Sequence, residues 1–320
     1  MSLKASLQTF ALATAALAAL GTAAVAQTKI TAGTASFNEA LLPIYTAQEK
    51  GYFKDVGLAV EMVAFKGGGP AVQALVSGSI DMCLCAADHV VRLKARRQPA
   101  KILVGLDEFH SYALVAKADF PFKDYKEMKG KKLGITSPGS LTDNTLRYSI
   151  AKAGMSAERD FEIIGTGGGA PMTAAIDSGQ LDAGLLITTD VVAMLQKAGA
   201  YKVVVDYRQM PYASFGAIVL DSWVKAHPKE AKDFAQAVVK AIGDLKKDPK
   251  LAADITAKMY PNFSPELAAE VAKSAVSRMP NGGVVSAESI KNLNDIVTAT
   301  DDTLKPVTLE EAFDAKLISN

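Results

Sequence analysis

The sequence has few of the residue patterns that catalytic and metal sites require. It contains three histidines in 320 residues, and no two of them stand at the spacing of a metal-binding pair. It lacks a P-loop and the G-x-G-x-x-G fingerprint after its first predicted strand, and Ile135 stands where a nucleophile elbow needs glycine. We therefore expect no catalytic residue, no metal, no cofactor and a protein that is not an enzyme.

An excess of charge of either sign is also absent. Lys and Arg number 35 and Asp and Glu number 34, which gives a formal net charge of +1. A chain with this balance has no global positive potential to attract nucleic acid or an acidic membrane surface. We expect a monomer that binds a small molecule and no nucleic acid.

Cysteine is scarce, since only Cys83 and Cys85 occur. They stand two apart in a predicted strand, so their side chains point to the same face but lie too far apart for an easy bridge. We interpret them as small buried apolar residues. A disulfide or a metal-binding pair is the alternative.

The one extended apolar run that the sequence offers stands near its N-terminus. Lys4 precedes an Ala- and Leu-rich run from Ala5 to about Leu20, and Ala24-Val25-Ala26 follows. This order is typical of a secretory signal peptide, and the run is too short for a comfortable membrane span. We predict that residues 1–26 are a signal peptide cleaved near Ala26, and that the mature protein is periplasmic.

Two glycine-rich units of the same order dominate the rest of the chain. Residues 67–81 and 167–182 each hold a glycine triplet, an apolar helix-period run, a Ser-Gly turn and the start of a strand. Around them strands and helices alternate, which predicts an α/β fold with parallel-type sheets. Two further strands, at 111–117 and 214–220, are placed as crossovers between two similar lobes. The predicted division is 27–112 for the first lobe, 113–213 for the second, and 214–320 for a return to the first lobe with a helical C-terminal third.

The candidate site follows from this fold, because open parallel sheets bind ligands beyond the carboxyl ends of their strands. Glycine loops and helix N-termini at those ends present backbone N–H groups to a ligand. Aromatic residues there would flank an organic part of the ligand. The candidate ligand-binding residues at these strand ends are Ser36, Phe37, Asn38, Gly68, Gly69, Ala87, Asp88, His89, His110, Ser137, Ser140, Leu141, Thr142, Gly168, Thr188 and Tyr212.

Several of these residues have an ordinary structural alternative. Ser140 and Thr142 fall in the first turn of a predicted helix, where a hydroxyl caps the helix as readily as it binds a ligand. His89 and His110 are either structural or a source of positive charge that grows as pH falls. The basic run 92–97 ends a helix, where cations complement the dipole, and it has no aromatic partners for base stacking, so we do not interpret it as a nucleic-acid site. The C-terminal helices are expected to pad the first lobe and to contribute little chemistry.

Four segments in order carry a family resemblance: 47–61 (AQEKGYFKDVGLAVE), 77–81 (SGSID), 129–140 (KGKKLGITSPGS) and 178–184 (SGQLDAG). Together they resemble the periplasmic substrate-binding proteins of ABC importers. The nearest branch is the one that binds taurine, aliphatic sulfonates and nitrate, with its thiamine-precursor-binding relatives. The resemblance implies a type II-like two-lobe fold and ligand contacts within 36–38, 68–69, 87–89 and 137–142 and at Thr188.

The same resemblance implies a function. The expected role is an extracytoplasmic protein that captures a small organic anion, such as a sulfonate or carboxylate, and delivers it to an ABC permease. One alternative is a thiamine-precursor (pyrimidine) binding or biosynthetic protein, although the cysteine-rich motif of those relatives is not found here. The other is a sensor-associated receptor.

Overall fold

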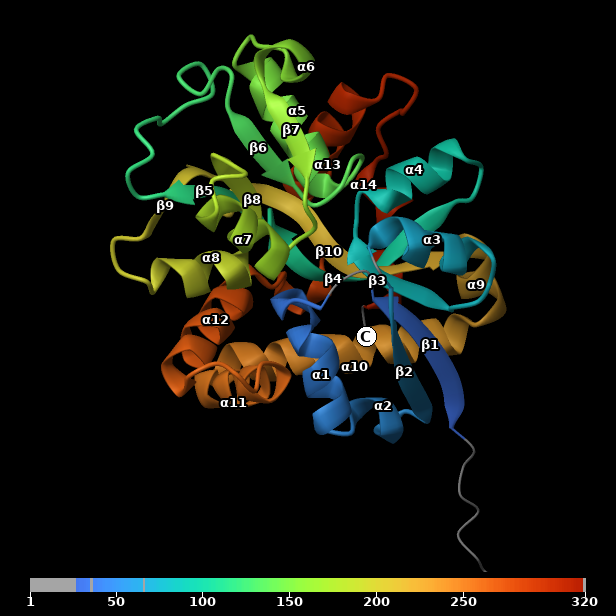
Figure 1. The fold of residues 1–320 in the computed structure, drawn as a ribbon. Coiled ribbons are helices and arrows are strands. Elements are labelled where there is room, and N and C mark those ends of the chain that lie inside the picture. Colours follow the sequence, from blue (N-terminus) through green and yellow to red (C-terminus); the bar gives the residue numbers. More distant parts are fainter. Residues whose placement is uncertain (1–26, 35–36, 66, 319–320) are drawn as a thin grey trace, which may run out of the picture.

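The computed structural model describes residues 27–34, 37–65 and 67–318. The predicted signal peptide and Ser36 lie outside the described residues. Within them the chain forms two five-stranded sheets, each covered by helices (Figure 1). We call the sheet that contains the N-terminal strand, with its helices, lobe 1, and the other sheet with its helices lobe 2.

The sheet of lobe 1 has the strand order β2-β1-β3-β10-β4. β1 pairs in parallel with β2 and β3, whereas β10 runs antiparallel to β3 and β4. The strands are β1 (Thr28–Thr34), β2 (Leu58–Ala64), β3 (Met82–Ala86), β4 (Ala100–Phe109) and β10 (Pro211–Leu220). The helices between them are η1 (Glu39–Leu41), α1 (Leu42–Glu49), α2 (Tyr52–Asp55), α3 (Gly68–Val76) and α4 (His89–Ala95).

The sheet of lobe 2 has the order β7-β6-β8-β5-β9, with β5 antiparallel to its two neighbours. Its strands are β5 (Tyr112–Lys117), β6 (Lys132–Ile135), β7 (Glu162–Gly165), β8 (Ala183–Ile187) and β9 (Tyr201–Asp206). Its helices are α5 (Leu141–Lys152), α6 (Ala157–Asp160), α7 (Ala170–Asp177) and α8 (Thr188–Leu195).

The chain passes from lobe 1 to lobe 2 between β4 and β5 and returns between β9 and β10. The predicted α/β two-lobe fold with two crossover segments is confirmed. Both sheets are mixed, because a strand that enters from the other lobe runs antiparallel to its new neighbours. The domain boundaries after Tyr112 and Ala213 stay a prediction, and they lie next to these two passages.

The C-terminal third is helical, as expected. Asp248 and Ser264 each cap a helix that begins with proline, and their side chains accept hydrogen bonds from the N–H groups of Leu251 and Leu267. In the described part of the chain, no helix is both long enough and apolar enough to span a membrane. The elements are α9 (Asp221–Ala226), α10 (Pro228–Lys247), α11 (Pro249–Met259), α12 (Pro265–Arg278), η2 (Asn281–Gly283), α13 (Ala287–Thr300), α14 (Leu309–Ala312) and η3 (Ala315–Leu317).

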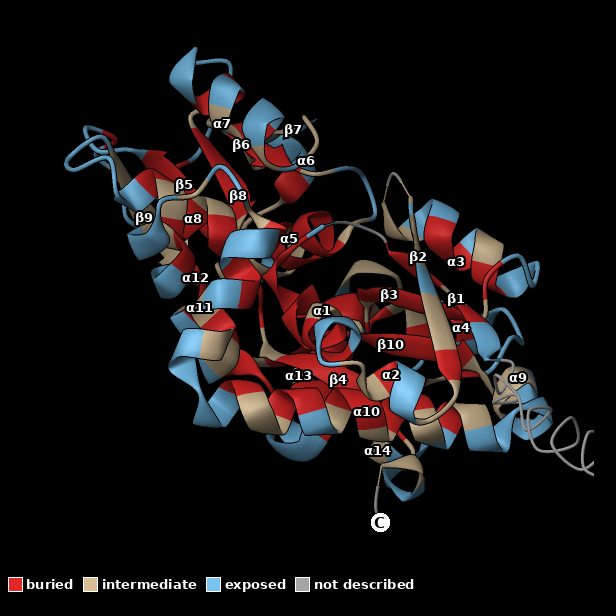
Figure 2. Ribbon diagram, turned by 90° about the horizontal axis from the view of Figure 1, so that it is seen from below, coloured by how far each residue is buried: buried red, intermediate tan, exposed pale blue. Residues whose placement is uncertain are grey.

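These helices do more than cover lobe 1. α10 packs against α1 and α2 through buried residues (Figure 2). Phe234 of α10 stacks on Phe53 of α2 with ring centroids 5.1 Å apart. α12 also packs against α8 of lobe 2, and α13 packs against α5. A hydrogen bond of 3.2 Å from Gln196 to Glu270 joins α8 to α12. The C-terminal third therefore connects the two lobes.

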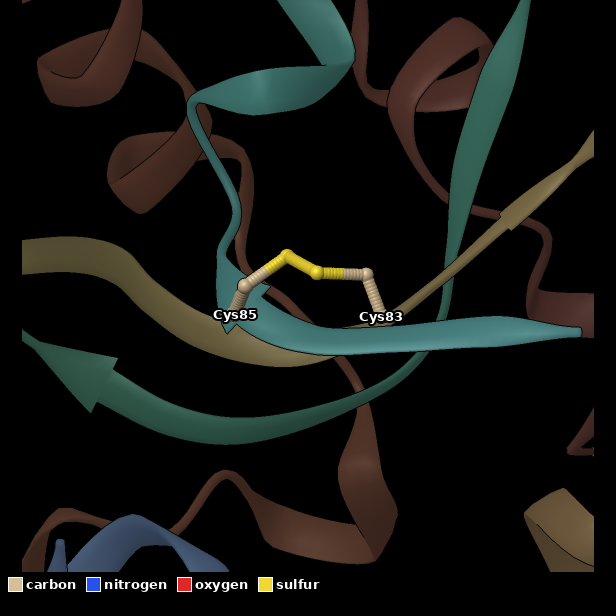
Figure 3. The surroundings of a disulfide bond; sticks show 2 residues. All are labelled: Cys83 and Cys85. Atoms are coloured by element: carbon tan, nitrogen blue, oxygen red, sulfur yellow. A yellow bond between two sulfur atoms is a disulfide. The ribbon is translucent and has the colours of Figure 1, made fainter. Parts of the chain in front are cut away.

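The two cysteines differ from the prediction. Cys83 and Cys85 form a disulfide, and both side chains stand on the same side of β3 (Figure 3). Their Cα atoms are 5.5 Å apart, within the range that a disulfide spans, because β3 is less extended here than an ideal strand. The prediction that the pair lies too far apart for an easy bridge is wrong, and the disulfide that was kept as the alternative is present. Both residues are fully buried, as expected.

Candidate functional site

A cleft of about 950 Å³ lies between the lobes, at the carboxyl ends of several strands. Lobe 1 lines it with residues that follow β1, β2 and β3, and lobe 2 lines it with residues that follow β6, β7 and β8. The strand-end rule therefore points to a real cavity. We call this cavity the cleft.

Both glycine loops border the cleft. Gly67 and Gly169 precede α3 and α7, and each has a positive φ, of 108° and 66°. An L side chain is disfavoured at such φ values, which explains glycine at these two positions. Gly68 is required for another reason: a Cβ there would lie 2.4 Å from Nε2 of His89. The loop is thus packed against the His89 ring.

The first turn of α5 enters the cleft from lobe 2. Ser140 caps this helix by accepting a hydrogen bond of 3.3 Å from the N–H of Asp143. Thr142 is fully buried, and its hydroxyl accepts from the Thr136 N–H at 2.9 Å. Ser140 and Thr142 share a 2.7 Å hydrogen bond. Both hydroxyls therefore hold the loop before α5 in shape, and the ligand role of Ser140 stays a prediction.

The structure brings most of the predicted site residues together and leaves others outside the cleft. The predicted residues that line it are Phe37, Asn38, Gly68, Gly69, Asp88, His89, Ser137, Ser140, Leu141 and Gly168. Those that are buried elsewhere are Ala87, His110, Thr142, Thr188 and Tyr212. Their strands and helices are correctly located, but their side chains point into the core beside the cleft.

Neither histidine supplies a positive charge at neutral pH. His110 is fully buried and hydrogen-bonds through Nε2 to Thr145 at 2.8 Å, and burial lowers its pKa to about 3. His89 borders the cleft, but burial also lowers its pKa, with the nearby Arg92 acting in the same direction. The structure gives no support to the expectation that a histidine strengthens anion binding as pH falls.

Positive charge in the cleft comes from the basic run 92–97, which was interpreted only as a helix end and was not among the candidate site residues. Arg92 and Arg96 line the cleft, and 22% of the Arg92 side chain is exposed. The Nε atom of Arg92 lies 3.7 Å from Oδ2 of Asp88. His89 and Arg92 are three residues apart on α4 and so share a face of that helix. This spacing from His89, a predicted site residue, could have indicated from the sequence that Arg92 lines the cleft.

Two carboxylates face the same cleft. Asp88 is 2% exposed, and its Oδ1 atom has no hydrogen-bond partner among the described residues. Asp190 lies in the first turn of α8, and burial, followed by the negative charge of Glu39, raises its pKa to about 6. Within the described ranges no hydrogen bond or ion pair involves the Asp190 side chain. Asp88, a predicted site residue, lines the cleft. Asp190 also lines it but was not among the predicted site residues.

Aromatic rings form part of the cleft wall. Tyr112 from β5, Tyr260 after α11, and Phe37 all line it. The rings of Phe37 and Tyr260 meet edge-on with centroids 5.1 Å apart. Tyr260 was missed because the C-terminal third was expected to contribute little chemistry. That expectation is wrong, since a helix distant in sequence places this ring at the cleft.

Buried polar groups tie α8 of lobe 2 to lobe 1 behind the cleft. Arg278 forms an ion pair with Asp107, donates to the Ser111 hydroxyl at 3.0 Å and contacts the Thr188 hydroxyl. Thr189 donates a hydrogen bond to the carboxylate of Glu39, whose pKa is raised by burial. Arg278, Glu39 and both threonines are at most 6% exposed, so water does not weaken these bonds.

A metal role has no support in the described residues, where no group of three or more His, Cys, Asp or Glu could hold an ion. The cleft thus offers glycine loops, helix N-termini, two arginines, two carboxylates and aromatic walls. This is the equipment of a binding site for a small polar organic molecule.

Comparison with known proteins assigns the family. The sequence pattern described as "NMT1/THI5 like" matches residues 38–252. The chain belongs to the NMT1/THI5-like family. A curated relative, 4-amino-5-hydroxymethyl-2-methylpyrimidine phosphate synthase THI13 of Saccharomyces cerevisiae, is 27% identical over 245 residues, which cover 71% of this chain and 68% of the yeast protein. YtlA of Bacillus subtilis, whose name describes it as a binding protein, is 25% identical over 62% of this chain and 60% of its own length.

Solved structures agree on the fold. A protein of Bordetella bronchiseptica RB50 superposes with a TM-score of 0.77 at 26% identity, over 91% of this chain and 95% of that one. The periplasmic aliphatic sulphonate binding protein SsuA of Escherichia coli gives a TM-score of 0.69 at 18% identity, covering 89% and 92%. The periplasmic nitrate-binding protein NrtA of Synechocystis PCC 6803 gives 0.66 at 17%, covering 91% and 87%. The predicted resemblance to this group of binding proteins is confirmed.

The prediction that the chain is not an enzyme is contradicted by its relatives. The yeast protein and its Aspergillus parasiticus counterpart, both 27% identical, are named as synthases and are therefore enzymes. The absence of familiar catalytic motifs was a weak argument, because catalytic groups can be spread through a fold without a short local signature.

Proposed function

We propose that this chain is a monomeric, extracytoplasmic solute-binding protein. It captures a small organic anion, such as a sulfonate or a carboxylate, between its two lobes and delivers it to an ABC permease. The proposal includes export by the N-terminal signal peptide, which lies outside the described residues.

The observation that carries the proposal is that each lobe contributes a positively charged group to the cleft. Arg92 of lobe 1 and the first turn of α5 in lobe 2 both line it. A helix N-terminus presents unpaired N–H groups and a partial positive charge, and a guanidinium adds a full charge with several donors. An anion bound there would contact both lobes at once, which favours a closed arrangement of the lobes.

The contacts behind the cleft support the same mechanism. The first turn of α8 is bonded to lobe 1 through Thr188 and Thr189, on the side where α8 meets α12. If this side stays bonded, the lobes separate at the opposite side, where the glycine loops of α3 and α7 border the cleft. A ligand would then enter between the glycine loops and be enclosed when they approach each other.

A second candidate has its own support. The yeast relative is named for a phosphorylated aminopyrimidine, and the aromatic rings of Tyr112, Tyr260 and Phe37 would stack on such a ring. In that case the chain binds or forms a pyrimidine. This candidate differs from the first in that it needs a planar aromatic ring in the ligand.

A thermal-shift screen tests both candidates. The mature chain would be heated with ethanesulfonate, 2-aminoethanesulfonate, propionate, 3-aminopropionate and 4-amino-5-hydroxymethyl-2-methylpyrimidine. A ligand at 100 times its dissociation constant should add about 2.7 kcal/mol to the free energy of unfolding. Stabilisation by an acid supports the main proposal, and the Arg92→Gln variant should lose it. Stabilisation by the pyrimidine alone would replace the main proposal with the second candidate.

A further inference from the structure

The turn that follows α12 holds the sole Asn-Gly dipeptide of the chain. Asn281 is followed by Gly282, whereas the other asparagines precede Glu, Thr, Phe, Leu or Asp, or end the chain. Glycine has no side chain to hinder the approach of its backbone nitrogen to the preceding residue, and it adopts most backbone conformations. Asn-Gly is therefore the dipeptide in which the backbone attacks an asparagine side chain with the least steric hindrance.

The turn leaves the reacting groups accessible. Asn281 and Gly282 are both exposed. η2 is a single turn, with hydrogen bonds of 3.3 Å from the Gly283 N–H to the Pro280 carbonyl and of 3.2 Å from the Val284 N–H to the Asn281 carbonyl. In the part of the chain that the structure describes, the Gly282 N–H donates no hydrogen bond. Few bonds therefore have to open before the Gly282 nitrogen can turn toward the Asn281 side chain.

A lysine already polarises the side-chain amide. The Nζ atom of Lys246, in the last turn of α10, donates a hydrogen bond of 2.6 Å to Oδ1 of Asn281. Attack on the side-chain carbon moves negative charge onto this oxygen. A cation that is in place before the reaction begins stabilises that charge as it develops.

We propose that Asn281 is a site of spontaneous deamidation, in which Lys246 stabilises the charge that develops on Oδ1. The Gly282 nitrogen gives its proton to hydroxide or water and forms a bond to Cγ of Asn281. The bond from Cγ to the side-chain nitrogen then breaks, and this nitrogen takes a proton from water and leaves as ammonia. Water opens the cyclic imide at either carbonyl, which gives aspartate or isoaspartate. The net reaction consumes water, releases ammonia and is independent of the cleft and its ligand.

The two products should differ in stability. Aspartate at position 281 keeps the normal backbone and exchanges the hydrogen bond with Lys246 for an ion pair. Isoaspartate adds a methylene to the backbone of a turn that lies close against β4. A Cβ on Gly283 would lie 2.6 Å from Cγ2 of Val104, and a Cβ on Gly105 would lie 3.3 Å from the Gly283 carbonyl oxygen. The isoaspartate form should therefore unfold at a lower temperature than the aspartate form.

Peptide mapping by mass spectrometry tests the proposal on the mature chain, incubated at pH 8.5 and 37 °C. Position 281 should be the first to show the mass gain of an amide that becomes an acid. Asn262 is the control in the same molecule, because it is also exposed but precedes Phe263. Lys246→Met should slow the reaction at least three-fold. Lys247→Met removes the neighbouring charge of the same helix end and should leave the rate unchanged.

The same chain unfolded in guanidinium chloride gives the rate without the fold. If position 281 reacts there but stays intact in the folded parent, the turn protects Asn281 and the proposal is overturned. Equal rates in the folded parent and Lys246→Met would overturn the role of Lys246, and equal melting temperatures of the two lysine variants show that a slower rate is not a stability effect. The isoaspartate fraction, separated by ion exchange, should melt below the Asn281→Asp variant, and equal melting temperatures would contradict the close packing of this turn on β4.

Discussion

The hydroxyl of Thr189 in lobe 2 donates a hydrogen bond to the buried carboxylate of Glu39 in lobe 1. The next residue along the chain, Asp190, faces the cleft. The bond between the lobes and the free carboxylate thus belong to the same turn of α8. The position of Asp190 in the cleft is therefore fixed by a contact between the lobes.

Removal of this bond tests its contribution to stability. We expect Thr189→Val to lower the free energy of unfolding by about 1–3 kcal/mol, because the buried Glu39 carboxylate loses a donor. Urea denaturation at pH 7 measures the change. Thr46→Val is a matched control: Thr46 is also buried, but its hydroxyl bonds only to the Leu42 carbonyl within α1, so a smaller loss is expected. Equal losses in the two variants would show that the Thr189–Glu39 bond stabilises the folded protein no more than a hydroxyl bond within a helix does.

The buried ion pair between Arg278 and Asp107 should be more sensitive. Arg278→Met leaves the Asp107 carboxylate buried without its cation, and we expect a loss of about 3–5 kcal/mol. The double variant Arg278→Met/Asp107→Asn, which removes both charges, should recover part of that loss. Urea denaturation of both variants measures it. A double variant less stable than Arg278→Met would contradict the assignment of the loss to an unpaired charge.

Neighbouring glycines of the first loop should differ in their tolerance of a methyl group. A Cβ on Gly68 would lie 2.4 Å from His89 Nε2, whereas a Cβ on Gly69 has no heavy atom within 4 Å. We expect Gly68→Ala to displace the His89 ring and cost roughly 1–3 kcal/mol, and Gly69→Ala to be tolerated. Thermal unfolding of the two variants measures this, and equal melting temperatures would contradict the packing of His89 on Gly68.

The raised pKa of Asp190 predicts a pH effect on the unliganded protein. Because the folded state holds this proton more tightly than the unfolded state does, the stabilising effect of protonation is lost as pH rises through about 6. Between pH 5 and pH 8 the parent should lose roughly 1.4 kcal/mol more than Asp190→Asn does. Glu39 shifts in the same direction, so only the difference between parent and variant isolates Asp190. Identical pH profiles of the parent and Asp190→Asn would contradict the view that ionisation of the partly buried Asp190 destabilises the folded protein.

The sequence predicted the fold because its signals are local. The glycine loops at 67–69 and 167–169, with the apolar runs after them, repeat one strand–loop–helix unit, and a parallel sheet brings all such loops to one edge. For the same reason most of the predicted site residues line the cleft. Long-range packing has no such signal. Tyr260 reaches the cleft through the packing of α11 on α1, and Arg278 reaches the region behind it through the packing of α12 on α8. Both packings depend on many weak contacts between segments distant in sequence.

Two other misses have a local cause. Arg92 was assigned to a solvated helix end because its charge fits the dipole there, although it also shares a face with His89. The Cys83–Cys85 bridge was disfavoured by assuming an ideal strand, and β3 departs from that geometry by enough to bring the Cα atoms to 5.5 Å. In both cases a general rule, the helix dipole for Arg92 and ideal strand geometry for the cysteines, was applied without the local structure that decides the outcome.

The central claim is that two lobes close on a small organic anion, and small-angle X-ray scattering tests it most directly. The radius of gyration of the mature chain would be measured without ligand and with a saturating concentration of the acid that binds most tightly in calorimetry. The account predicts a smaller radius of gyration with the acid and no change in Arg92→Gln at the same concentration. An unchanged radius in the parent, with the acid shown to be bound, would contradict capture by closure.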